Sequence, residues 1–350
     1  MKLNKIFVCE FITGGGLCAG VLAKSLSKEG AMMRDALLDD LLNQVETDNL
    51  TVFKCQISTT LDARLPALNF SVETTVISAK DDPWAVWEGL IKTCDAVLVI
   101  APETDDVLLR FAQLTQRLGK VWLGCSLDAI TICGDKLKTY DFLHAHGVSI
   151  PTFSWADLLA YANNNLNVLF ENGNQLVAKP RDGAGCEDTF VFDRADDLNQ
   201  FMQNGRKNSH IIQLFIEGEP ASLTMLCSNG NAQLFSCNAQ KVTQHKGKLQ
   251  YKGSRVNGMA RHWRVFENVS KQLASWLPGL NGVVGIDVVI GKKYGKDILC
   301  IIEINPRITT SYVGLKKAIV RNPAQLMLEA TFNPNFKMPK IQKNVVNVHV

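Results

Sequence analysis

The sequence predicts an α/β protein in which an N-terminal parallel-sheet domain precedes two subdomains of mixed α+β structure. Over residues 1–122, short apolar strands alternate with helical patterns, which is typical of a parallel sheet covered on both faces. Beyond residue 150, strand–turn–strand patterns replace this alternation and indicate antiparallel hairpins. The 350 residues, 46% hydrophobic and 20% charged, have the composition of a globular protein with a sizeable core.

The N-terminal domain is predicted over residues 1–122. A glycine run follows its first strand, and the apolar run of its fourth ends at Pro102. Ligands gather at the carboxyl ends of parallel strands, so we expect Gly14, Gly15 and Gly16 and the segment APET (101–104) at the mouth of a binding site. The expected strands are KIFVCEF (5–11), TVFKCQI (51–57), TTVISA (74–79) and DAVLVIAPE (95–103), and a helix is expected over 105–120.

The first subdomain is predicted over residues 123–210. It begins with a helix bounded by Asp135 and Gly147. A hairpin follows over residues 175–192, where two apolar strands flank a glycine-rich loop.

The second subdomain is predicted over residues 211–350. Further strands are expected up to residue 242, an amphipathic helix over 263–277, and a hairpin of two buried strands over 282–307. Residues 245–261 are polar, basic and rich in glycine, which predicts a mobile loop.

The composition also indicates the cellular compartment and the class of binding partner. A net charge of +3 is near neutral for this length, so we expect neither a nucleic acid nor an anionic membrane as a partner. The ten cysteines form no CxxC pair and several lie inside apolar runs, as expected of reduced, buried thiols. The short apolar start meets Glu10, and no stretch approaches transmembrane length. We therefore predict a cytoplasmic protein.

Three oxygen-bearing side chains interrupt the last hairpin. Asp287 lies on its first strand and Glu303 on its second, so strand pairing could place them side by side. Glu303 and Asn305 are two residues apart and point to the same face. This set suits a hard cation, Mg²⁺ or Mn²⁺, completed by phosphate oxygens and water. The alternative is that both carboxylates pair with lysines at a sheet edge.

Two lysines and a glycine loop suggest a phosphate site. Lys179 ends an apolar strand directly before the loop that contains Gly183 and Gly185. Glycine lets backbone N–H groups approach a phosphate, and the lysine would add a positive charge. Lys136 opens the preceding helix and could reach the same phosphates. The alternative is an ordinary hairpin turn beside a solvated lysine.

The strand IIQLFIEGEPAS, residues 211–222, turns from apolar to acidic. Such a strand can present groups to the edge of an adenine ring, and a carboxylate after it can bind ribose hydroxyls. We therefore add Gln213, Phe215 and Ile216 as adenine-contacting candidates and Glu217 or Glu219 as the ribose-binding candidate.

The order of these features decides between the interpretations. A lysine at a helix start, a lysine before a glycine loop, an apolar strand into an acidic turn, an aspartate and E-x-N-P-R follow one another. Over about residues 120–310 this order resembles the ATP-grasp family. The resemblance implies an ATP-grasp fold, in which a Rossmann-like domain precedes two α+β subdomains that clasp ATP. It also implies that a carboxylate is phosphorylated before an amine displaces the phosphate.

The resemblance implies roles for individual residues as well. The three oxygen-bearing residues of the last hairpin would bind the metal, and Arg307 would meet the transferred phosphate. Lys179 and Arg255 complete the expected catalytic set. One departure concerns the ribose: many relatives carry a glutamate shortly after the hinge glycine, where this chain has Pro220. Either glutamate of that turn could take its place.

A narrower resemblance, to the tyramine–L-glutamate ligases of methanofuran-type cofactor biosynthesis, covers most of the chain. The segments that carry it are KIFVCEFITGGGL, GCSLDAI, GDKLKTY, EGEPASL and IEINPRITTSYVGL. It implies that the γ-carboxylate of L-glutamate is joined to tyramine, with the glycine run and the loop around Arg255 near the acceptor. The expected partners are small-molecule substrates, and a homodimer is a candidate assembly.

Three competing interpretations stay open. Gly14, Gly16 and Ala19 satisfy G-x-G-x-x-A, as in an NAD-dependent dehydrogenase, but the second strand ends in Gln56 and Ser58 instead of an acidic residue. A non-catalytic ATP-binding regulator would be favoured by the loss of a metal ligand or a lysine, and none is lost. The main rival is a ligase of the same kind that acts on another amino acid or a peptide.

Overall fold

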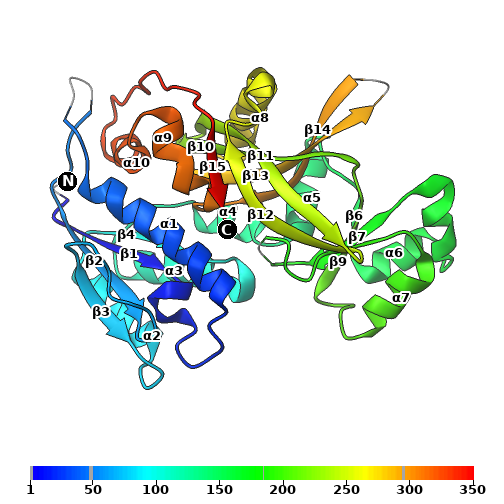
Figure 1. Ribbon diagram of the computed structural model, residues 1–350, viewed down its shortest axis with the longest axis horizontal. Helices are drawn as coiled ribbons and strands as arrows, with labels where there is room; N and C mark the ends of the chain where they lie inside the picture. Colours follow the sequence, from blue (N-terminus) through cyan, green and yellow to red (C-terminus); the bar gives the residue numbers. More distant parts are fainter. Residues whose placement is uncertain (1–2, 47–49, 184, 294–295) are drawn as a thin grey trace.

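The computed structural model describes residues 3–46, 50–183, 185–293 and 296–350. Its first sheet is parallel, has the order β3-β2-β1-β4-β5 and lies within residues 1–122 (Figure 1). The predicted alternation of strands and helices is therefore confirmed. The strands are β1 (Lys5–Glu10), β2 (Gln56–Asp62), β3 (Glu73–Ile77), β4 (Ala96–Ile100) and β5 (Val121–Trp122).

The position of β2 corrects the prediction of a strand over residues 51–57. The strand begins at Gln56, and its centre consists of Ser58, Thr59 and Thr60, which are fully buried. Their polar composition concealed a core strand, although threonine is β-branched and suits a pleated sheet. The apolar Val52 that suggested a strand is only half-buried.

Helices cover both faces of the parallel sheet. Ile6 and Val8 of β1 belong to the core beneath α1, whereas Phe7 and Cys9 belong to the core beneath α2 and α3. Successive strand side chains point to opposite faces, and this alternation divides the two cores. The helices are α1 (Lys24–Leu42), α2 (Pro83–Lys92) and α3 (Val107–Arg117), and two short turns, η1 (Ile12–Gly16) and η2 (Thr104–Asp106), follow β1 and β4.

The second sheet follows the order β14-β13-β10-β11-β12-β8-β7-β9-β6, with β15 on β12. A single residue pair, Lys248 with Phe190, joins β12 to β8, so the sheet has two halves. Figure 1 shows the half of β6 to β9 on the right, away from the parallel sheet. The strands are β6 (Thr152–Phe153), β7 (Leu176–Pro180), β8 (Phe190–Phe192), β9 (His210–Leu214), β10 (Gly218–Ser228), β11 (Asn231–His245), β12 (Lys248–Val256), β13 (Gly282–Lys293), β14 (Lys296–Asn305) and β15 (Val346–His349).

Two features of this sheet differ from the sequence-based expectations. β9 pairs with β6 and β7, so the first half extends to Leu214, beyond the expected boundary at residue 210. Residues 248–256, within the segment predicted as a mobile loop, form β12, which pairs with β11 and β15. Backbone hydrogen bonds to β11 and β15 stabilise this strand on both sides. Its polar, glycine-rich composition did not predict a strand, because strand formation depends on such neighbours.

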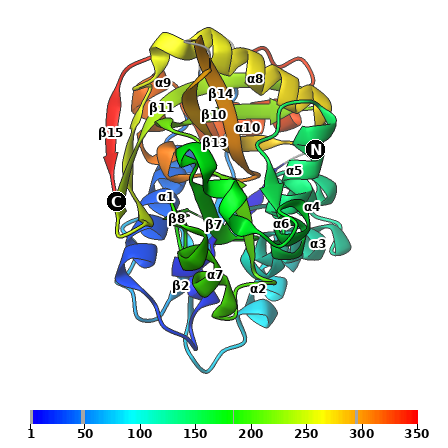
Figure 2. The same ribbon diagram turned by 90° about the vertical axis from the view of Figure 1, so that its right-hand side faces the viewer.

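The remaining helices pack around the second sheet. α8 lies against β11, α9 lies against β11 and β15, and α10 lies against α1, β10 and β13. Figure 2 shows these helices together with β15 at the edge. These helices are α5 (Lys136–Ala145), α6 (Trp155–Tyr161), α7 (Ala195–Gln203), α8 (Trp263–Trp276), α9 (Leu315–Ile319) and α10 (Pro323–Phe332), with short turns η3 (Leu166–Gly173), η4 (Ala260–His262) and η5 (Thr310–Gly314).

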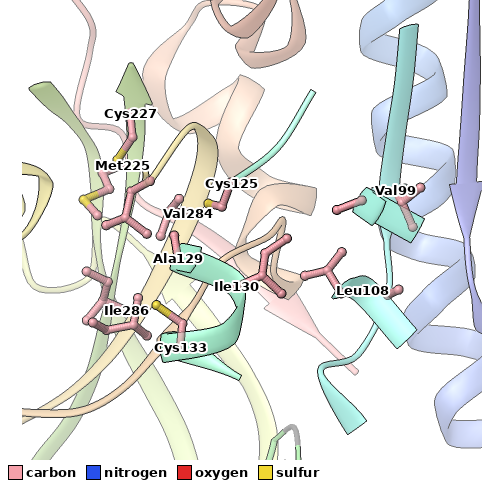
Figure 3. Close-up of a cluster of buried hydrophobic side chains, with 14 of the residues drawn as sticks. Val99, Leu108, Cys125, Ala129, Ile130, Cys133, Met225, Cys227, Val284 and Ile286 are labelled. Carbon is pink, nitrogen blue, oxygen red and sulfur yellow. The ribbon is translucent and has the colours of Figure 1, made fainter. Parts of the chain in front are cut away.

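One short helix joins the two sheets through a continuous apolar core. In α4 (Leu127–Cys133), Ile130 points toward Leu108 of α3, whereas Ala129 and Cys133 point toward Val284 and Ile286 of β13 (Figure 3). All three side chains are buried, so close packing connects the parallel sheet with the second sheet. Among the described residues, no helix combines the length and the apolar character needed to span a bilayer.

Candidate active site

Two cavities meet at the middle of the second sheet. The inter-sheet cavity lies between the two halves of this sheet, and the interdomain cavity lies between the sheet and the N-terminal domain. Residues that line both cavities mark the junction. They are Gly185, Gln240, Tyr251, Asp287 and Glu303.

A pair of carboxylates lies at this junction. Asp287 of β13 is paired directly with Glu303 of β14, as the sequence predicted. Asn305 Nδ2 donates to Asp287 Oδ2 over 3.2 Å, and Gln240 Nε2 donates to Asp287 Oδ1 over 2.7 Å. Burial and, after it, the neighbouring Glu303 together raise the pKa of Asp287 to about 7. The pair therefore concentrates negative charge in the interior.

Two buried lysines face this charge. Lys179 Nζ donates to Gln213 Oε1 over 3.0 Å, and Lys136 Nζ lies 3.6 Å from Glu303 Oε2. Burial lowers the pKa of Lys179 to about 8, and Glu303 opposes the shift. Burial alone would raise the pKa of Glu303, but Lys136 and Lys179 lower it below its usual value. The predicted lysines and carboxylates thus form one electrostatic cluster.

The cluster fits a divalent cation of the magnesium type. Asp287, Glu303 and Asn305 offer oxygen donors only, which hard cations prefer. Asp287 and Glu303 are paired and buried, and burial together with their mutual repulsion raises the pKa of Asp287. A divalent cation between them would neutralise this charge, whereas burial of the bare pair is unfavourable. These three residues could therefore hold Mg²⁺.

The glycine loop closes over the cluster from the first half of the sheet. Gly183 O accepts a hydrogen bond of 2.5 Å from Lys136 Nζ, so the loop and α5 are linked at this point. Gly185 has a φ of +65° and lines both cavities. A side chain at Gly185 would be strained in that conformation. The loop can thus bring its backbone close to a ligand beside Lys179.

The connection after β9 contributes an apolar wall. Gln213, Phe215 and Ile216 line the inter-sheet cavity, where the sequence predicted contacts to an adenine ring. Both predicted ribose-binding residues are exposed, and neither Glu217 nor Glu219 lines the cavity. Glu219 instead accepts two hydrogen bonds of 2.6 Å from the guanidinium of Arg261.

Arg307 reaches the cluster from the second half of the sheet. Its Nη2 donates to Asn305 Oδ1 over 3.3 Å, while Nε and Nη2 form a two-point pair with Glu103, each over 3.0 Å. Burial would lower the pKa of Arg307, but Glu103 raises it. Glu103 was not predicted as a site residue, although its loop was expected at the mouth of the site. The pair links the N-terminal domain to the cluster.

The glycine run after β1 has a packing function. An added Cβ at Gly14 would lie 2.9 Å from Thr60 Oγ1, and one at Gly16 would lie 2.3 Å from the ring of Phe11. Gly15 has a φ of +98° and permits the tight turn. None of the three lines either cavity. Their turn instead presents Ile12 to the interdomain cavity.

Arg255, predicted as catalytic, is not brought to the cluster. It is exposed on β12 and lines neither cavity. The preceding Ser254 lies 3.3 Å from Ser311, at the wall of the interdomain cavity, and successive strand residues point to opposite faces. Two residues that the sequence did not single out take part instead, Gln240 and Tyr251, on strands on either side of the β11–β12 turn.

Comparisons with known proteins identify the family and agree with the fold. A family model described as the ATP-grasp domain matches residues 133–311, and a model described as the pre ATP-grasp 3 domain matches residues 55–130. Two curated relatives are named tyramine–L-glutamate ligase. The one from Methanocaldococcus jannaschii is 28% identical over 96% of this chain and 94% of its own. The one from Methanocaldococcus fervens is 27% identical over 86% and 87%.

Solved structures show the same fold at low identity. A protein from Archaeoglobus fulgidus, described as a member of the ATP-grasp superfamily, has a TM-score of 0.65 and 21% identity and covers 99% of both chains. An L-amino acid ligase from Bacillus licheniformis has a TM-score of 0.62 and 17% identity over 95% of this chain and 75% of its own.

Proposed function

Because this chain belongs to the ATP-grasp family and is a ligase of that family, we propose that it joins the γ-carboxylate of L-glutamate to the amine of tyramine. ATP would be converted to ADP and phosphate, and the product would enter the biosynthesis of a methanofuran-type cofactor. One observation carries the proposal. The carboxylate pair of Asp287 and Glu303 lies where the two cavities meet, so a nucleotide in one cavity and an acid in the other would approach each other there.

ATP would occupy the inter-sheet cavity. Its adenine would lie against Phe215 and Ile216, which line the apolar end of that cavity. Its phosphates would point toward Lys179 and the glycine loop, where buried positive charge is little screened by water. Lys136 would reach the same phosphates from the start of α5.

The transfer step requires neutralisation of charge. Mg²⁺ held by Asp287, Glu303 and Asn305 would supply that neutralisation for the phosphate oxygens. Arg307, held by Glu103 beside Asn305, would stabilise the negative charge of the group in transfer. The γ-phosphoryl group moves from ATP to a carboxylate oxygen of the acid, which gives ADP and an acyl phosphate.

The second step forms the amide bond. The neutral amine attacks the acyl carbon, the bond from that carbon to the phosphate oxygen breaks, and the nitrogen loses one proton. Phosphate is a far better leaving group than the oxide of a free carboxylate, which is the reason for the first step. Tyr251 and Gly185 border both cavities and would limit the access of water to the acyl phosphate.

A substrate panel tests this proposal. Purified protein is incubated with ATP and Mg²⁺ and with every pairing of several amino acids and several primary amines, and ADP release is measured with product identified by mass. We expect ADP release to require both substrates and to be fastest with L-glutamate and tyramine. Lys179→Ala serves as the control for contaminating ATPase activity.

Two outcomes would contradict the proposal at different levels. If another acid or amine supports ADP release and this pair does not, the substrate assignment is wrong and the ligase chemistry stands. If AMP and pyrophosphate are the products, the acyl-phosphate route is wrong.

A further inference from the structure

One face of α1 forms a wall of the interdomain cavity. Leu26, Glu29, Gly30 and Met33 all line this cavity. They are spaced by three and four residues, so they lie on one side of the helix. The wall therefore combines a single carboxylate with apolar side chains on either side of it.

The two glutamates of this part of the cavity differ in their free hydrogen-bonding capacity. Glu10 accepts from Thr13 N over 2.7 Å, from Thr13 Oγ1 over 2.6 Å and from Ile12 N over 3.1 Å, and it is buried. Its oxygens are thus occupied by the turn that follows β1. Glu29 accepts one hydrogen bond, from Thr310 Oγ1. Within the described part of the chain, no cation lies within ion-pair distance of Glu29. It therefore keeps acceptor positions for a ligand.

The charges of the cavity indicate which ligand these positions suit. Among the described residues that line the interdomain cavity, Arg307 alone is positively charged, and its ion pair with Glu103 neutralises that charge. The remaining charged side chains are carboxylates, and Asp287 and Glu303 are assigned to the metal. A cationic group of a ligand beside Glu29 would form a charge-assisted hydrogen bond. A carboxylate of a ligand would be repelled by Glu29 in the same position.

We propose that Glu29 binds the ammonium group of the amine acceptor, with the acceptor's apolar body against Leu26 and Met33. The ammonium releases one proton to water as it leaves Glu29, which gives the neutral amine that attacks the acyl carbon. This inference rests on the proposed ligase function and names a residue that selects the substrate. A primary amine with an aromatic or aliphatic body matches a carboxylate flanked by apolar side chains. An acidic amino acid matches the wall less well, because it carries two carboxylates and no apolar body.

Kinetics of Glu29→Gln test the proposal, because this substitution keeps the shape and removes the charge. We expect the KM for tyramine to rise by about 10- to 100-fold, the loss usual for a hydrogen bond to a charged group. The KM values for L-glutamate and ATP should stay within about twofold. Inhibition by 4-ethylphenol, which lacks the ammonium group, should be unchanged. Glu46→Gln removes the same charge from an exposed residue beyond the other end of α1 and should change nothing.

A melting curve first establishes that the variant is folded, and Thr310→Val provides a second test. Loss of the Thr310 hydroxyl leaves the Glu29 carboxylate in place without its only described donor, so we expect a smaller rise in the KM for tyramine.

An unchanged KM for tyramine in folded Glu29→Gln, beside an active wild type, would overturn the role of Glu29 and leave the ligase function intact. A rise confined to the KM for L-glutamate would overturn it too, because Glu29 would then bind the ammonium of the acid. If wild type shows no amine-dependent ADP release, the proposed function fails and the inference fails with it.

Discussion

Replacement of Glu303 by glutamine distinguishes two roles for this residue, that of a metal ligand and that of a structural carboxylate. The amide preserves the shape of the side chain and removes one negative charge from the junction of the two cavities. If Glu303 only pairs with a lysine in the sheet, the change should reduce stability and spare catalysis. If Glu303 binds the metal that neutralises the triphosphate, the change should act on the transition state more than on folding.

The expected change in stability is small because two effects oppose each other. The attraction between Glu303 and Lys136 over 3.6 Å amounts to about 5 kcal/mol at an effective dielectric constant of about 20. Loss of Glu303 also removes its repulsion of Asp287, which together with burial raises the pKa of Asp287, so the lost attraction is offset in part. A net change of about 1 kcal/mol, or a shift in Tm of a few degrees, is therefore expected.

The expected change in catalysis is large. Removal of one preorganised electrostatic group typically costs about 100-fold in turnover, and we expect at least that loss for Glu303→Gln. The assay measures ADP release against Mg²⁺ concentration, beside a melting curve of each protein. Excess Mg²⁺ should restore part of the activity. Glu219→Gln is the matched control, since it makes the same change at an exposed carboxylate paired with Arg261. Near-normal turnover of Glu303→Gln at limiting Mg²⁺ would refute the assignment.

Three further substitutions test other parts of the site and the fold. Lys179→Ala should lose most of the affinity for ATP and Lys136→Ala less, measured by calorimetry; wild-type affinity in Lys179→Ala would contradict the position assigned to the phosphates. Glu103→Gln should lower kcat by about tenfold with an unchanged Kd for ATP, because Arg307 loses its two-point partner; an unchanged kcat would show that the pair is only structural. Burial raises the pKa of Asp40 from 3.8 to about 6, so its protonated form favours folding. That contribution is complete below about pH 4 and is lost as pH rises to about 6, by at most about 3 kcal/mol. Asp40→Asn stays neutral and should therefore gain Tm relative to wild type between pH 4 and pH 7, whereas a constant difference across that range would contradict the assignment.

The sequence predicted those site residues whose positions depend on segments close together in the chain. Asp287 and Glu303 interrupt the apolar strands of one hairpin, so pairing of those strands could bring them together, and the two residues are directly opposite each other in β13 and β14. Lys179 could be placed for a similar reason, since it ends an apolar strand before a glycine loop. Both predictions need only the alternation of side chains along a strand and the identity of the residues that follow the strand.

Contacts between distant segments were not accessible in this way. Glu103 and Arg307 are separated by 204 residues, and no periodicity relates them. Tyr251 lies in a segment whose glycines and lysines predicted a loop, although pairing with β11 and β15 makes it a strand. The carboxylate of Glu29 acquires its position only when α1 packs beside η5. Such residues are found from the tertiary structure, because their neighbours come from other domains.

The central claim is that a carboxylate is phosphorylated before the amine attacks, and isotope transfer tests it most directly. L-Glutamate labelled with ¹⁸O in its γ-carboxylate is converted in the presence of ATP, Mg²⁺ and tyramine, and the phosphate is examined by mass spectrometry. If the acyl phosphate forms, the bridging oxygen leaves with the phosphoryl group, so each phosphate released should carry one ¹⁸O atom and the amide should retain the other. Unlabelled phosphate, or label in AMP, would contradict the account.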